Sequence, residues 1–189
     1  MAKMNWIEKP IVNSKSWNWI YRRLIYNKFL DFVGSKLKGN ILEIGCGVGK
    51  TTHFLAEKYD KIKITAVDYD KEQIKVANKN KKYKNIKFEL GDATSLNFKK
   101  NSFDCVIETN VFHHIKDYQK AIREVRRVLK NNGVFYLIDV SKYFLGPIAT
   151  FFLESAFTRQ DFINNLENNG FKIEKYGRNF FFFIAAKKV

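Results

Sequence analysis

The sequence has little cysteine and no long hydrophobic run, and these two shortages exclude several classes of protein. Cys46 and Cys105 are the only cysteines among 189 residues, too few for a disulfide framework or for a zinc site built from several thiolates. No apolar run reaches the roughly 18 residues that a membrane-spanning helix needs. The first ten residues are charged and lack the apolar segment of a secretory signal, so we expect a cytoplasmic protein with no metal site.

Acidic residues are also scarce. The chain contains 34 Lys and Arg against 19 Asp and Glu, a net charge of +15, and most of the excess lies before residue 133. A surface of this kind can bind lipid headgroups, RNA or an acidic substrate. The same lysines can equally form plain solvated faces in a chain that is rich in Lys and Asn, and both interpretations stay open.

Proline is rare, and no repeat or low-complexity linker interrupts the chain, so we expect one domain. Within it we expect an N-terminal helical cap over residues 1–38, a cofactor-binding core over 39–140, and a short substrate-side segment with two C-terminal strands over 141–189. Apolar periodicity predicts helices over residues 16–37, 50–59, 71–80, 118–130 and 159–168. It predicts strands over residues 41–44, 62–67, 86–90, 103–108, 134–140, 171–176 and 179–187.

The alternation of strands and helices predicts an open α/β sheet with helices on both faces. The last two predicted strands are joined only by a turn at Gly177, so they must be antiparallel. In such a sheet, ligands bind beyond the carboxyl ends of the strands, next to the first strand. We therefore searched those strand ends for residues that could hold a ligand.

The strand ends carry a glycine loop and three carboxylates. Residues 45–49 have glycine at every second position, a spacing of GxGxG and not the GxGxxG of dinucleotide sites. Glu43 precedes this loop, Asp68 ends the second strand and can accept both ribose hydroxyls, and Asp92 follows the third and can accept an exocyclic amine. Three carboxylates around one crevice suit an adenosine that carries positive charge and no phosphate. S-adenosylmethionine is such a molecule.

Five segments in order resemble the successive motifs of class I S-adenosylmethionine-dependent methyltransferases. They are ILEIGCGVGKTT (41–52), AVDYD (66–70), FELGDAT (88–94), FDCVIETNVFHHI (103–115) and AIREVRRVLKNNGV (121–134). The type 11 group, similar to the ubiquinone and menaquinone biosynthesis methyltransferases, is the branch indicated. The resemblance implies a Rossmann-like, doubly wound seven-stranded sheet of order 3-2-1-4-5-7-6, with the last strand antiparallel and an N-terminal helical cap.

The resemblance also implies how the cofactor contacts are divided among the strand ends. The residues that would hold the methionine moiety are Glu43, Gly45, Cys46, Gly47 and Gly49. Asp68 and Tyr69 would hold the ribose and one adenine face, Asp92 and Ala93 would read the adenine edge, and Thr109 and Asn110 would lie near the methyl group. Structural alternatives stay open, because the glycine loop could be a simple tight turn and either aspartate could be a helix N-cap.

Methyl transfer from a sulfonium is an in-line displacement, so the protein mainly has to align the nucleophile and exclude water. A general base is needed where the nucleophile must lose a proton. His113 and His114, directly after the fourth strand, are the candidate catalytic residues, although at least one of them would pack or cap the following helix. Tyr21 and Tyr143 are weaker candidates.

The acceptor is indicated only in outline. Residues 109–112 lack the Asn/Asp-Pro-Pro-aromatic motif of enzymes that methylate nucleobase amines, which disfavours a base-modifying role. The apolar residues of 16–37 and 141–157 either pack over the sheet or bind a hydrophobic small-molecule or lipid-like acceptor. In the second case the basic N-terminal helix would rest on an anionic membrane at its inner face. An RNA or protein methyltransferase, a non-catalytic S-adenosylmethionine-binding partner subunit, and a nicotinamide-dependent oxidoreductase are the alternatives.

Overall fold

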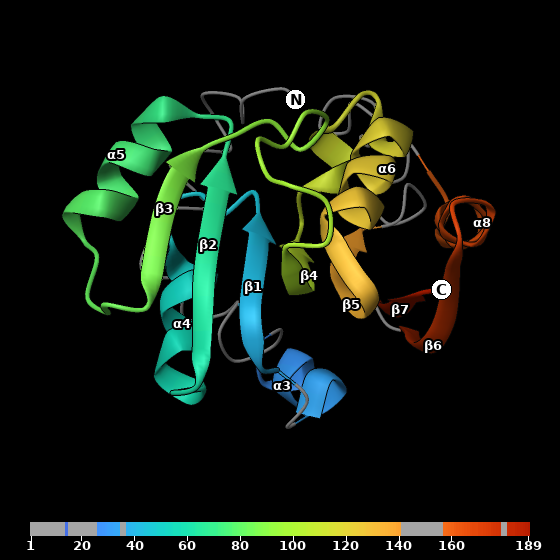
Figure 1. The fold of residues 1–189 in the computed structure, drawn as a ribbon, viewed down its shortest axis with the longest axis horizontal. Helices are drawn as coiled ribbons and strands as arrows, with labels where there is room; N and C mark the ends of the chain where they lie inside the picture. The colour runs from blue at the N-terminus through green and yellow to red at the C-terminus, as the bar shows by residue number, and fades with distance from the viewer. Residues whose placement is uncertain (1–13, 15–25, 35–36, 141–156, 179–180) are drawn as a thin grey trace.

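A computed structural model describes residues 14, 26–34, 37–140, 157–178 and 181–189. Its centre is a seven-stranded sheet of order β3-β2-β1-β4-β5-β7-β6, the order that the family resemblance predicts (Figure 1). The strands from β1 to β5 are parallel, and β7 runs antiparallel to both of its neighbours. Their bounds are β1 Gly39–Ile44, β2 Ile62–Asp68, β3 Ile86–Leu90, β4 Phe103–Thr109, β5 Leu129–Val140, β6 Phe171–Arg178 and β7 Phe181–Lys188.

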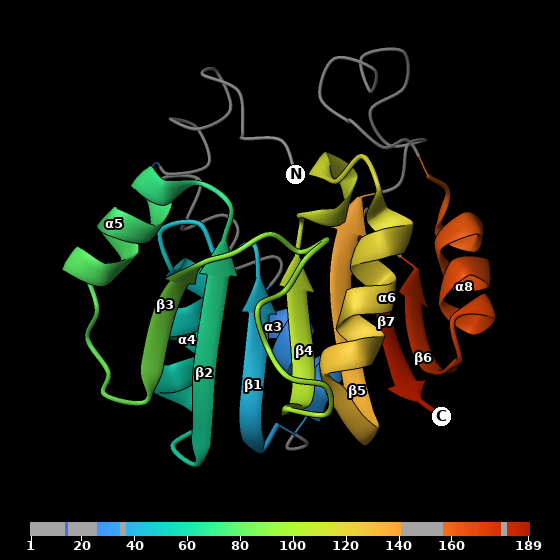
Figure 2. The ribbon, with the colours of Figure 1, turned by 45° about the horizontal axis from the view of Figure 1, so that its top comes forward.

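Helices cover both faces of the sheet, as Figure 2 shows. The described helices are α3 Asn27–Val33, α4 Lys50–Lys58, α5 Lys71–Lys79, α6 Tyr118–Val128 and α8 Arg159–Asn168, with a short 3-10 helix, η3, at Phe112–His114. The inward side chains of α6 and α8 share one apolar core with alternate residues of the central strands. Those of α3, α4 and α5 share a second core with the intervening strand residues. Because successive side chains of a strand point to opposite faces of the sheet, each central strand contributes residues to both cores.

Local capping explains where several helices begin. Asp70 accepts a hydrogen bond from Glu72 N at the start of α5, and Asp117 accepts one from Lys120 N at the start of α6. Thr158 begins α8 with a capping box, in which its side chain accepts from Asp161 N while the Asp161 carboxylate accepts from Thr158 N. These caps satisfy backbone N–H groups that a helix leaves unpaired, so they define the helix starts.

Three predicted boundaries are wrong. Gly177 is not a turn, because it lies inside β6 opposite Phe183, and the link to β7 falls at residues 179–180, outside the described residues. The helix predicted to run to residue 130 ends at Val128, because Leu129 is already extended and begins β5 five residues earlier than predicted. The continuous helix predicted over residues 16–37 is interrupted at Gly34, which has φ 64°. The N-terminal part of that prediction and residues 141–156 lie outside the described residues.

Candidate functional site

The glycine loop between β1 and α4 closes over the carboxyl end of β2. The backbone N–H groups of Gly45 and Cys46 both donate to Val67 O, at 2.8 and 3.0 Å. All three glycines of residues 45–49 have positive φ, from 54° to 83°. A Cβ placed on Gly45 would overlap the side chain of Val111, so this position tolerates only glycine. The loop therefore presents bare backbone at the edge of the sheet where the sequence predicts the ligand.

Glu43 is buried beside this loop, with 1% of its surface exposed. Its Oε2 accepts a 2.5 Å hydrogen bond from Thr52 Oγ1, whereas its Oε1 is buried without a partner among the described residues. Burial, and to a smaller extent the charge of Asp68, raises the pKa of Glu43 from 4.5 to about 7, against the lowering effect of the Thr52 hydrogen bond. One carboxyl oxygen is thus available for a cationic group.

Asp68, the last residue of β2, ties that strand to the glycine loop. Its Oδ2 accepts a 2.7 Å hydrogen bond from Gly47 N, and its Oδ1 accepts one from Asp70 N at 2.8 Å. Asp70, not Asp68, is the N-cap of α5. Tyr69 is 41% exposed, so its ring is accessible next to this carboxylate.

Asp92 and Ala93 follow β3. Asp92 Oδ1 accepts hydrogen bonds from Thr94 N and Thr94 Oγ1, at 2.8 and 2.9 Å, which closes a tight turn and caps no helix. Asp92 is half-buried and Ala93 fully buried. Because β1, β2 and β3 are neighbours in the sheet, the three predicted carboxylates lie at the carboxyl ends of adjacent strands, as expected.

The end of β4 contributes a hydroxyl chain that the sequence did not indicate. Thr109 Oγ1 lies 3.3 Å from Thr51 Oγ1 on α4, which in turn lies 3.0 Å from the hydroxyl of the buried Tyr26. Asn110 has φ 58°, and its N–H donates to Ile138 O at 2.7 Å. The structure thus places Thr109 and Asn110 at the same sheet edge as the glycine loop.

A buried acid–histidine cluster occupies the ends of β4 and β5. His113 Nδ1 lies 2.5 Å from Asp139 Oδ1, and Glu108 accepts a hydrogen bond from Val111 N. Burial, and then the neighbouring His113 ring, lowers the pKa of His114 to about 3. Sequence reasoning missed Glu108 and Asp139, although an acidic residue inside an otherwise apolar strand is an unusual feature.

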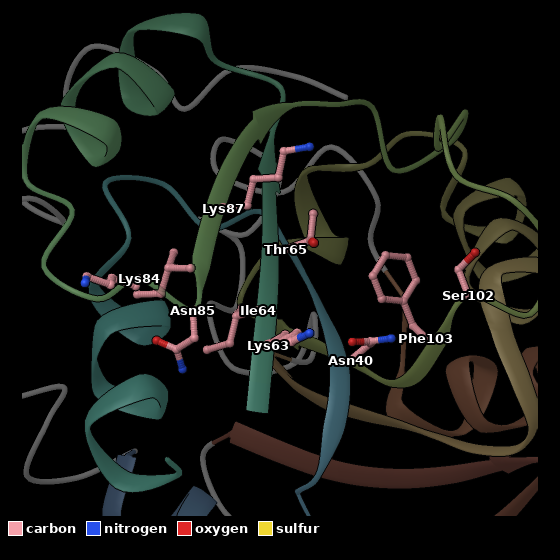
Figure 3. A pocket seen from close by; sticks show the side chains of 10 residues that line it. Asn40, Lys63, Ile64, Thr65, Lys84, Asn85, Lys87, Ser102 and Phe103 are labelled. Carbon is pink, nitrogen blue, oxygen red and sulfur yellow. The ribbon is translucent and has the colours of Figure 1, made fainter. Parts of the chain in front are cut away.

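The cysteines are structural. Cys46 and Cys105 are buried, and burial raises the pKa of both thiols well above its ordinary value, as suits small space-filling residues. A hollow in the surface lies elsewhere, at the amino ends of the strands (Figure 3). Its lining includes Lys63, Lys84 and Lys87, on a part of the sheet where the link between β3 and β4 contains no helix. It is therefore separate from the carboxyl-end site.

A comparison with protein families shows to which family this chain belongs. A family model described as a methyltransferase domain, of the type 11 group, matches residues 42–137, a range that contains the glycine loop, the three carboxylates and the histidine turn. The chain belongs to this methyltransferase family. The family and the fold together assign S-adenosylmethionine as the cofactor, in agreement with the motifs.

Curated relatives and solved structures agree with the family. The chain is 40% identical over 102 residues to the Bacillus subtilis methyltransferase YcgJ, covering 52% of this chain and 40% of the relative. It is 29% identical over 140 residues to the demethylmenaquinone methyltransferase of Thermotoga maritima, covering 72% and 59%. The chain thus spans about half the length of these relatives.

In fold, the chain is similar to the PH0226 protein of Pyrococcus horikoshii, with a TM-score of 0.79, 20% identity, and coverage of 94% and 93% of the two chains. It is also similar to an S-adenosylmethionine-dependent methyltransferase of Mesorhizobium loti, with a TM-score of 0.74, 17% identity, and coverage of 84% and 95%. Among the described residues, no helix is long and apolar enough to cross a membrane.

The residues at the carboxyl ends of the strands fit the cofactor. When bound, S-adenosylmethionine supplies a methyl group on a positively charged sulfur. Glu43 Oε1 is buried and has no partner in the part of the chain that the structure describes, so it is the kind of group that a cationic ligand would satisfy. The three glycines of residues 45–49 leave stretches of backbone without side chains, which a ligand can approach closely.

Proposed function

We propose that this chain transfers a methyl group from S-adenosylmethionine to a small-molecule or lipid-like acceptor, mainly by proximity and orientation. The observation that carries the proposal is the buried Glu43 Oε1, which has no partner among the described residues and stands at the same sheet edge as Asp68 and Asp92. A dinucleotide, with its phosphates, would meet three carboxylates there. A cationic nucleoside would be stabilised by them.

In this proposal the chain's own residues divide the work of holding the cofactor. Glu43 and the backbone of residues 45–49 bind the methionine end. Asp68 accepts hydrogen bonds from the ribose, and Tyr69 packs on the adenine. Asp92 and Ala93 read the edge of the adenine, and Thr109 and Asn110 line the space around the methyl group. Fixing these groups in advance converts a bimolecular reaction into one between aligned partners.

The relatives' names support a small acceptor. Several are named for demethylmenaquinone, and one from Rauvolfia serpentina is a norajmaline N-methyltransferase. A quinone precursor and an alkaloid are both small and largely apolar molecules. For this chain, the net charge of +15 would add a peripheral contact with an anionic membrane from the cytoplasmic side, or with RNA.

Calorimetry with S-adenosylhomocysteine tests the site. We expect Asp68→Ala and Asp92→Ala each to weaken binding by about 1–3 kcal/mol, the cost of leaving a hydrogen-bonding partner unpaired. Asp60→Ala is the matched control, because Asp60 is exposed on the link between α4 and β2, at the opposite edge of the sheet. Unchanged affinity in both site variants would refute the assignment. Stabilisation by NADH in place of S-adenosylhomocysteine would favour an oxidoreductase.

A panel of acceptors tests the chemistry. Transfer of a labelled methyl group is measured to 1,4-dihydroxynaphthalene, to phosphatidylethanolamine vesicles, to tRNA and to a protein extract. We expect methylation of the naphthalene diol or the lipid. Methylated tRNA or protein would favour the alternatives that use the basic surface, and cofactor binding without any methylation would favour a non-catalytic partner subunit. Retention on tRNA or on anionic liposomes at physiological salt separates the two surface contacts.

A further inference from the structure

Asp139, near the end of β5, contacts His113 with both of its carboxylate oxygens. Its Oδ1 lies 2.5 Å from His113 Nδ1, and its Oδ2 accepts a 3.2 Å hydrogen bond from the His113 backbone N–H. Asp139 is completely buried, between strands that do not move relative to each other without breaking the sheet. A rigid carboxylate that holds the ring and the backbone of one histidine fixes both the position and the rotation of the imidazole.

This contact also determines which ring nitrogen carries the hydrogen. A carboxylate oxygen only accepts, so the hydrogen lies on Nδ1 and the neutral ring keeps its lone pair on Nε2. His113 Nε2 makes no hydrogen bond with a described residue, and the His113 side chain is 11% exposed. The imidazole therefore presents a basic nitrogen that the fold leaves unused.

Glu108 lies in the same buried region as Asp139. Burial, and then the charge of Asp139, raises the pKa of Glu108 well above its ordinary value. Glu108 is fully buried, and its Oε2 has no partner among the described residues. Glu108 accepts from Val111 N and so holds the turn before η3, while Asp139 pairs with the histidine.

The histidine turn adjoins the cofactor loop. η3 begins three residues after the end of β4, and Val111, between them, packs directly against Gly45. Thr109, the last residue of β4, lies 3.3 Å from Thr51 at the start of α4. The turn that carries His113 is therefore built onto the same edge as the proposed methyl-transfer site.

His114 does not share this arrangement. Its ring centroid lies 4.0 Å from that of His113, and burial and that neighbour lower its pKa to about 3. A base that weak gains little from taking a proton near neutral pH. His114 is thus a packing residue, and His113 is distinguished from it by its carboxylate partner.

We propose that His113 Nε2 removes the acceptor's proton and that Asp139 is the positioning residue that holds the ring for this step. The inference rests on the proposed function and concerns acceptors whose nucleophile carries a proton. The acceptor atom forms its bond to the methyl carbon, the carbon–sulfur bond breaks, and its electron pair remains on sulfur. The acceptor's proton passes to Nε2 and then to water.

The first test is a nitrogen-15 NMR spectrum of protein labelled at histidine, without acceptor. The sequence contains three histidines, so the spectrum is simple, and the His113→Gln variant assigns the relevant signals. We expect His113 in the tautomer with the hydrogen on Nδ1, and we expect Asp139→Asn to change it, because asparagine has one accepting oxygen where Asp139 uses two, one for the ring and one for the backbone N–H. A wild-type His113 with its hydrogen on Nε2 would overturn the proposal.

The second test is single-turnover methyl transfer to the panel member that is methylated fastest. We expect His113→Gln to slow the chemical step by about 10²- to 10⁴-fold and Asp139→Asn to slow it as well, with the KM for the acceptor unchanged. Asp104→Asn is the matched control. It makes the same change to a carboxylate that holds Asn40 N and Lys130 Nζ at the other end of β4, so its rate should match wild type. A rate unaffected by His113→Gln would disprove the base.

S-adenosylhomocysteine affinity keeps the two proposals apart. His113→Gln and Asp139→Asn should bind it as wild type does, because neither residue belongs to the carboxylate set at β1 to β3. If the variants bind S-adenosylhomocysteine as wild type does and transfer the methyl group at an unchanged rate, the role proposed for His113 is wrong and the proposed function is unaffected. Loss of affinity in both variants would show that the cluster supports the cofactor site instead, and would equally overturn the proposed role.

Discussion

Glu43 is a carboxyl group almost wholly removed from water, and burial raises its pKa from 4.5 to about 7. The folded protein therefore binds this proton more tightly than the unfolded chain does. Glu43 lowers the free energy of unfolding only where it would be ionised in the unfolded chain. This destabilisation is absent below about pH 4.5, grows between pH 4.5 and 7, and reaches its full size above pH 7. A shift of this size corresponds to about 3 kcal/mol.

We expect Glu43→Gln to remove this cost. In urea unfolding without cofactor, the variant should be more stable than wild type at pH 8, and the difference should shrink towards pH 5. Both proteins contain the same other titrating groups, so the contributions of those groups cancel in the difference between the two free energies of unfolding. A constant difference across this range would contradict the assigned pKa.

The same carboxyl should make cofactor affinity depend on pH. The ammonium group of the ligand favours the ionised form of Glu43, so wild type should bind S-adenosylhomocysteine more tightly by up to about tenfold at pH 8 than at pH 6. Glu43→Gln should bind weakly and with little pH dependence, as measured by calorimetry in both buffers. Parallel pH profiles in the two proteins would mean that the ligand's cation lies elsewhere.

At the scale of a single element, α8 shows how a short sequence pattern defines a helix. Thr158 and Asp161 satisfy each other's backbone N–H groups at its start, and the buried Phe162 anchors it in the core beneath. We expect Thr158→Ala to lower the free energy of unfolding by about 1 kcal/mol and Thr158→Ser to retain most of it, because serine keeps the hydroxyl acceptor. Equal stability of the alanine and serine variants in urea would show that the cap contributes nothing.

Elements with such local signals were predictable, and those decided by tertiary contacts were not. The carboxylates at the ends of β1, β2 and β3 could be placed because each lies at the end of a short apolar strand or just after it. Glycine is the usual residue of a turn, yet Gly177 pairs with Phe183 on β7 and so lies within a strand. The pair of His113 and Asp139 joins residues 26 apart, and only the adjacency of β4 and β5 brings them together.

At the scale of the whole molecule, a lysine on the C-terminal strand ties β7 to the parallel part of the sheet. Lys188, at the end of β7, is 8% exposed and donates from Nζ to Leu129 O at 2.6 Å and to Asn101 Oδ1 at 2.9 Å. Leu129 is the first residue of β5, and Asn101 lies in the link before β4. The ammonium group of Lys188 thus joins three segments that are distant in sequence. Burial, and then the charge of Arg126, lowers the pKa of Lys188.

We expect Lys188→Met to lower the free energy of unfolding by about 1–3 kcal/mol, because the apolar chain fills the same space but leaves the buried Leu129 O without this donor. Lys187→Met is the matched control. Lys187 is the adjacent residue on the opposite face of β7, and its side chain makes no hydrogen bond or ion pair with a described residue. Urea unfolding followed by circular dichroism should shift to lower urea in Lys188→Met and stay at the wild-type midpoint in Lys187→Met, because only Lys188 joins β7 to the start of β5. Equal midpoints in the two variants would mean that the Lys188 contacts contribute nothing to stability.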